Sequence, residues 1–125
     1  MPKDRRLSTD EVMRIGKVLD LLKDEGENPT ALAAIRFIAL TGFRRNEALL
    51  LEASWIAEDF RCIRFPDTKT GKQTRIIGEP AARVIRQQLK RSGQRFLFPA
   101  DIGDGAFVGL PRVLHRLLGQ VRKLL

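Results

Sequence analysis

The sequence predicts an α+β fold, a mainly helical bundle that carries a small antiparallel sheet of two or three strands. Three observations lead to this fold class. Apolar residues recur at helical spacing over residues 8–40 and again over 80–125. Between these regions, residues 61–65 and 74–77 alternate between polar and apolar side chains, as strands do. The chain has 125 residues, which is the usual length of one domain.

Two helices with clear start signals open the chain. Ser8 and Glu11 have the spacing of a capping box, and the apolar side chains that follow predict a first helix ending near Gly26. Asn28 and Pro29 are a second start signal, because Asn caps helices and Pro fits the first helical turn.

The second helix should be the buried centre of the bundle. It is expected from Thr30 to about Leu40, and it is apolar on nearly all sides. Thr41-Gly42 should end it, because Gly readily adopts the left-handed conformation of a C-cap. A short third helix is expected over about residues 46–52.

The alternating residues predict a hairpin with a basic tip. Residues 61–65 and 74–77 are the two strands, and residues 67–72 between them have the composition of a turn. Trp55 and Ile56 are the candidates for a third strand.

Two further helices should complete the fold. One is expected from Pro80 to about Gly93, and the other from about residue 110 to 125, with a loop over 94–107. His115 lies within the last helix, where we expect a partly buried structural side chain.

Positive charge is concentrated in one segment. The net charge is +8, and residues 60–100 contain ten Lys and Arg but only two Asp and Glu, whereas residues 1–59 have a net charge of −2. Such a segment is typical of a surface that binds a polyanion, most often nucleic acid. The alternative is a solvated basic face that only aids solubility.

Composition excludes several classes of protein. Cys62 and His115 are the only cysteine and histidine, so neither a disulfide framework nor a Cys/His zinc site is expected, and no metal site is predicted. The apolar runs are shorter than a membrane helix needs, and no secretory signal opens the chain. There is no tyrosine.

Arg44 lies at the junction of the second and third predicted helices. The backbone there is fixed on both sides, and Glu47 is close enough in sequence to hold the guanidinium. An arginine held in this way suits bidentate binding of a phosphate. The alternative is an ion pair at a helix end that binds no ligand.

Two short motifs carry a resemblance to a known family. Residues 41–47, Thr-Gly-Phe-Arg-Arg-Asn-Glu, resemble the Thr-Gly-x-Arg-x-x-Glu box of the tyrosine recombinases, the phage-integrase family. Residues 68–72, Thr-Lys-Thr-Gly-Lys, followed by Arg75, are similar to its Lys-Thr-Gly-Lys hairpin. The motifs occur in the family's order, and the resemblance covers roughly residues 6–118.

The resemblance implies DNA strand breakage and rejoining without a metal or nucleotide cofactor. These enzymes cut DNA with a tyrosine, and arginines stabilise the phosphate while a lysine protonates the leaving 5′-oxygen. By position, Arg44 matches the first catalytic arginine, Glu47 the acid that supports it, and Lys69 the hairpin lysine. DNA contacts are expected from the neighbouring cations Arg45, Lys72 and Arg75.

The family's His-x-x-Arg box, its nucleophilic tyrosine and its amino-terminal core-binding domain have no counterpart in the chain. Residues 1–125 are therefore expected to form a single partial catalytic domain that is inactive alone. The implied function is that of a DNA-binding fragment of a site-specific recombinase or integrase. The alternative is a non-catalytic DNA-binding or regulatory remnant of that fold.

The expected partner is double-stranded DNA, together with other recombinase protomers in a full-length protein, and no membrane. A cytoplasmic location in a bacterium, with a bacterial or phage origin, fits the single cysteine and the resemblance. A small basic RNA-binding protein is a further alternative. The arginine box argues against it, because RNA recognition usually shows exposed aromatic side chains for stacking.

Overall fold

A computed structural model describes residues 8–66, 73–92 and 95–124. Along the chain, the elements are α1 (Thr9–Asp24), α2 (Pro29–Thr41), α3 (Arg45–Leu49), a 3₁₀ turn (Ala53–Trp55), β1 (Cys62–Phe65), β2 (Gln73–Ile76), α4 (Glu79–Ser92) and α5 (Leu110–Leu124). This is a mainly helical fold with an antiparallel β1–β2 sheet, so the predicted fold class is confirmed.

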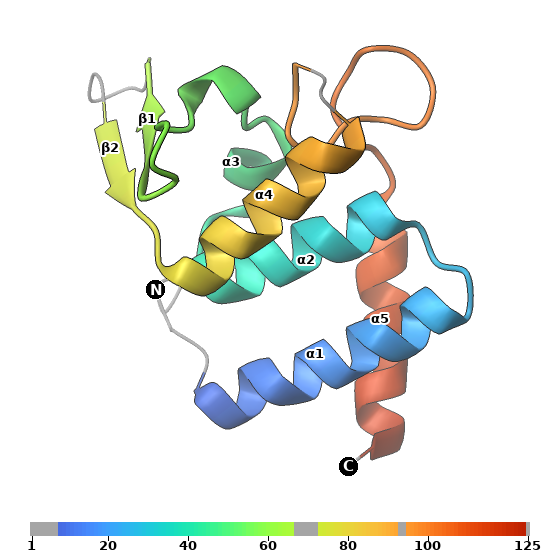
Figure 1. Ribbon diagram of the computed structural model, residues 1–125. Coiled ribbons are helices and arrows are strands. Elements are labelled where there is room, and N and C mark those ends of the chain that lie inside the picture. Colours follow the sequence, from blue (N-terminus) through green and yellow to red (C-terminus); the bar gives the residue numbers. More distant parts are fainter. Residues whose placement is uncertain (1–7, 67–72, 93–94, 125) are drawn as a thin grey trace.

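Helix α2 is the centre of the molecule, as predicted. It packs against α1, α3, α4 and α5, and Figure 1 shows it between α1 and α4, with α5 crossing behind and the hairpin beyond one end. An apolar surface on nearly every side allows this position, because each face of the helix meets another element. Its buried residues are Ala31, Leu32, Ala34, Ile35 and Phe37.

The first two helices begin at the predicted caps. The hydroxyl of Ser8 accepts a hydrogen bond from the Glu11 main chain at 3.1 Å, and the Glu11 carboxylate accepts one from the Ser8 main chain at 2.9 Å. The side-chain oxygen of Asn28 accepts hydrogen bonds from the main chain of Thr30 and Ala31. Both caps satisfy amide groups that the helix itself leaves without acceptors.

The hairpin has one buried face. Cys62 pairs with Ile76 and Phe65 pairs with Gln73 in an antiparallel register. Ile63 and Phe65 are buried, whereas Arg64 between them is exposed. The alternation of polar and apolar residues in the sequence therefore predicts which side of β1 faces the core.

The candidate third strand is absent from the part of the chain that the structure describes. Trp55 ends a 3₁₀ turn, and Ile56 forms a single bridge with Ile63. The Ala57 amide donates to the Cys62 carbonyl at 3.0 Å, but the 3₁₀ turn over Ala53–Trp55 precedes this contact, so the pairing with β1 is limited to one bridge. The sheet of the described residues thus has two strands.

His115 is exposed, so the prediction of a partly buried side chain was wrong. Helix α5 buries Leu110, Val113 and Leu117. These positions recur at helical spacing on one face, and His115 falls between them on the other side of the helix.

An ion pair joins α5 to the loop between α1 and α2. The Arg116 guanidinium donates to both carboxylate oxygens of Glu27, at 2.6 and 2.9 Å. The hydrogen bond from Arg116 lowers the pKa of Glu27 below its ordinary value, although partial burial acts in the opposite direction. Glu27 is therefore a carboxylate at neutral pH.

We expect Glu27→Gln to lower the stability of the protein at neutral pH but not in acid. The folded state depresses the pKa of Glu27, so its stabilising effect is present above the pKa of an unfolded glutamate and is lost as the pH falls through the folded value. Urea unfolding of both proteins at several pH values measures the difference. A gap that persists when Glu27 is protonated would contradict the ion-pair explanation.

Candidate functional site

The turn between α2 and α3 is held by three local features. Gly42 ends α2 in the left-handed conformation, with φ 76°. The Thr41 hydroxyl donates to the Phe37 carbonyl at 2.8 Å and accepts from the Phe43 main chain at 3.2 Å. The buried Phe43 ring packs edge-on against Phe37, with ring centres 5.4 Å apart. The backbone that leads to Arg44 is therefore fixed, as predicted.

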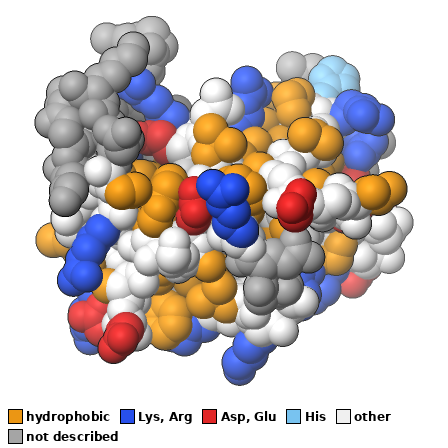
Figure 2. Space-filling model, turned by 90° about the horizontal axis from the view of Figure 1, so that it is seen from above, with side chains coloured by type: hydrophobic (Ala, Val, Ile, Leu, Met, Phe, Trp, Pro, Cys, Tyr) orange, Lys and Arg blue, Asp and Glu red, His pale blue; other side chains and the backbone are white. Residues whose placement is uncertain are grey.

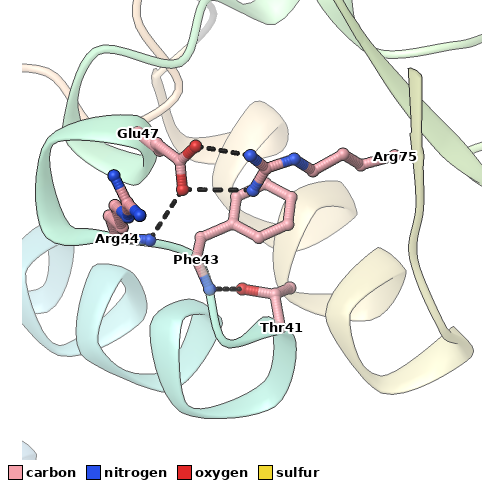
Figure 3. Close-up of polar contacts among 5 residues, drawn as sticks. All are labelled: Thr41, Phe43, Arg44, Glu47 and Arg75. Carbon is pink, nitrogen blue, oxygen red and sulfur yellow. Dashed lines mark hydrogen bonds and ion pairs between the residues drawn. The ribbon is translucent and has the colours of Figure 1, made fainter. Parts of the chain in front are cut away.

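Glu47 contacts Arg44 through the main chain. The amide of Arg44 donates to Glu47 Oε1 at 2.9 Å, at the start of α3 (Figure 3). The carboxylate thus caps the short helix instead of serving only as a partner for the Arg44 guanidinium. This contact fixes the direction in which the chain leaves the turn.

The guanidinium bound to Glu47 is that of Arg75. Its two terminal nitrogens donate to Oε1 at 3.1 Å and to Oε2 at 2.6 Å. The same guanidinium carbon lies 5.1 Å from the ring centre of Phe43 and 5.4 Å from that of Phe65. Figure 3 shows Arg75 reaching Glu47 from β2, on the side of the carboxylate away from Arg44.

Glu47 is ionised at neutral pH. Its partial burial would raise the pKa of the carboxyl, but hydrogen bonds from the Arg44 amide and the Arg75 guanidinium lower it, and the net shift is downward. An ionised carboxylate can accept all three of these hydrogen bonds at once.

The remaining predicted site residues are placed as follows. Arg44 and Arg45 are both exposed, so either guanidinium is accessible to an anion. Lys69 and Lys72 lie outside the described residues. Of the predicted catalytic pair, the structure therefore describes Arg44 but not Lys69.

Several arginines of the basic segment are engaged in ion pairs. Arg86 binds Glu79 at 2.5 Å, and Arg95 binds Glu52 at 3.1 Å. In the view from above in Figure 2, the described Lys and Arg side chains are spread among apolar and acidic ones. The charge excess of the segment is thus reduced locally by its acidic partners.

Sequence reasoning did not identify Phe43 and Phe65 as parts of the site. Their rings flank Arg75, although one follows α2 and the other ends β1. The only signal was the inward position of Phe65 in the alternating strand, which predicts burial but names no neighbour.

The sequence matches no protein-family model and no curated protein. The structure, in contrast, is similar over its whole length to the Tn1549 transposon integrase solved in complex with circular intermediate DNA, with a TM-score of 0.64 and 17% sequence identity. The matched part is 46% of that chain, so this protein spans about half of the integrase structure. The chain therefore has the fold of part of a tyrosine recombinase, as the sequence motifs predicted.

Two features are absent from the residues that the structure describes. No group of three or more His, Cys, Asp and Glu side chains could hold a metal ion. Over the same residues, the helices are too short or too polar to cross a membrane.

Proposed function

We propose that this chain is a DNA-binding part of a tyrosine-recombinase catalytic domain that acts in DNA integration and recombination. The observation that carries the proposal is the fixed turn that presents Arg44 beside Glu47. It occurs at the predicted motif, in a chain whose fold matches part of an integrase solved with DNA. An exposed arginine side chain on a fixed main chain is suited to phosphate binding.

In this function, Arg44 binds the phosphate that is to be cleaved, and Glu47 fixes the main chain beneath it. Lys69 acts as the acid that protonates the leaving 5′-oxygen, and Lys72 and Arg45 contact the backbone of the duplex. Arg44 and Arg45 are consecutive residues at the start of a helix, so their side chains point in different directions. This geometry suits contacts with two separate phosphates.

The composition favours a second candidate function, a DNA-binding remnant that performs no chemistry. The family cuts DNA with a tyrosine hydroxyl, and the chain contains no tyrosine. Both candidates require duplex DNA as the partner, and they differ only in whether a protein that contains this part of the domain forms a covalent intermediate with DNA.

Binding of a fluorescent DNA duplex by the 125-residue chain tests the proposal. The logarithm of the binding constant should fall linearly with the logarithm of salt concentration, because each neutralised phosphate releases counterions. Arg44→Gln and Arg45→Gln should each make the slope shallower by about 0.9, the contribution of one phosphate contact.

Arg14→Gln is the matched control for the loss of one charge. Arg14 is an exposed residue of α1, which Figure 1 shows on the other side of α2 from the hairpin, and its substitution should leave the slope unchanged. The proposal is wrong if the wild-type chain does not bind DNA at low salt, or binds it with an affinity independent of salt.

A further inference from the structure

The Arg75 side chain contacts three other side chains of the structure. Its guanidinium makes a two-point contact with Glu47, and the Phe43 and Phe65 rings lie 5.1 and 5.4 Å from its centre. The side chain is 36% exposed, although it belongs to the outer strand of a two-stranded sheet. This environment differs from that of Arg44 and Arg45, which are both exposed.

We propose that Arg75 is a positioning residue that locks strand β2 to the Arg44 turn through Glu47, and that it does not contact DNA. The statement that Arg75 does not contact DNA rests on the function proposed above. It assigns Arg75 a different role from the DNA contact that the sequence motif implied.

The geometry favours an internal role for three reasons. A paired, charge-assisted contact between a guanidinium and a carboxylate is among the stronger polar interactions in proteins. The two rings add cation–π attraction on the guanidinium. The two N–H groups that bind Glu47 are not available to a DNA phosphate, and a phosphate that displaced Glu47 would leave this carboxylate partly buried without its main cationic partner.

The contact joins α3, whose N-cap is Arg44, to β2, the strand that follows Lys69 in the sequence. Glu47 lies in α3, directly after the turn that presents Arg44, and Arg75 lies 28 residues further on, in β2. Lys69 precedes Arg75 by six residues in the sequence. Fixing β2 against α3 therefore fixes the base of the hairpin relative to Arg44.

The test is carried out on the 125-residue chain with two readouts, one of which does not involve DNA. The pKa of the Glu47 carboxyl, followed by carbon-13 NMR, should rise toward the ordinary glutamate value in Arg75→Gln. In Arg75→Lys the Glu47 pKa should also stay above its wild-type value, because an ammonium group cannot reproduce the two-point contact. Arg64→Gln removes the same charge from an exposed position of β1 and should leave the Glu47 pKa unchanged.

The second readout is the salt dependence of DNA binding. Arg75→Gln should weaken binding while the slope stays that of the wild type, because no phosphate contact is lost. A slope that is shallower by about 0.9, as expected for Arg45→Gln, would overturn the inference. If the wild-type chain shows no salt-dependent binding, the proposed function fails, and the Glu47 pKa still decides whether Arg75 holds Glu47.

A measurement on the wild-type chain covers the case in which the variants do not fold. The Nε–H signal of Arg75 should show the slow guanidinium rotation of a bound side chain, both without DNA and after the duplex is added. Release of this side chain when DNA is added would also contradict the inference.

Discussion

A nicked suicide substrate incubated with the 125-residue chain should give no covalent protein–DNA adduct. Strand cleavage in the tyrosine recombinases passes through a tyrosine hydroxyl, and the chain contains none. Fixed cations such as Arg44 stabilise charge on a phosphate but cannot replace the attacking group. The measurement is a denaturing gel of the reaction with a labelled DNA strand.

The same samples need a binding control. At low salt the chain should still shift the mobility of the labelled duplex on a native gel, so that a missing adduct reports on chemistry and not on binding. An adduct formed by this chain would mean that another side chain attacks the phosphate, and the proposed mechanism would then be wrong.

Leu51→Ala should destabilise the fold by about 2–5 kcal/mol, the usual cost of removing a fully buried leucine. Leu51 is completely buried just after α3, and its carbonyl accepts a hydrogen bond from the Leu97 main chain at 3.0 Å. The substitution leaves that hydrogen bond in place and removes only apolar contacts. Chemical denaturation followed by circular dichroism measures the change.

Leu50→Ala is the matched control, because it makes the same change one residue earlier in the chain. The Leu50 side chain is 54% exposed, so its loss should alter the free energy of unfolding by no more than about 0.5 kcal/mol. Equal effects at the two positions would contradict the packing around α3.

The sequence predicted the helices because their signals are local. The caps at Ser8 and Asn28 and the C-cap at Gly42 each depend on residues within one turn. The central place of α2 was predictable for a related reason, since a helix that is apolar on nearly all sides has to be covered by others. The arginine motif is also a local signal, because it comes directly after the Gly42 C-cap in the sequence.

The contacts between elements were less predictable. A period of apolar residues shows that Arg75 lies on a strand, but it does not reveal that a carboxylate 28 residues earlier faces it. Ile56 was a candidate for a third strand because its side chain suits a sheet. The residues before it, however, form a 3₁₀ turn, so the pairing with β1 stays at a single bridge, and only the main-chain hydrogen bonds show this.

The bond between Glu47 and Arg75 also sets the electrostatic potential at the turn. A lone carboxylate next to Arg44 would offset much of its positive charge and repel an approaching phosphate. Because Arg75 supplies a compensating charge at 2.6 Å, the two side chains together are close to neutral. Arg44 can then present nearly its full unit of charge to solvent while Glu47 still orders the main chain beneath it.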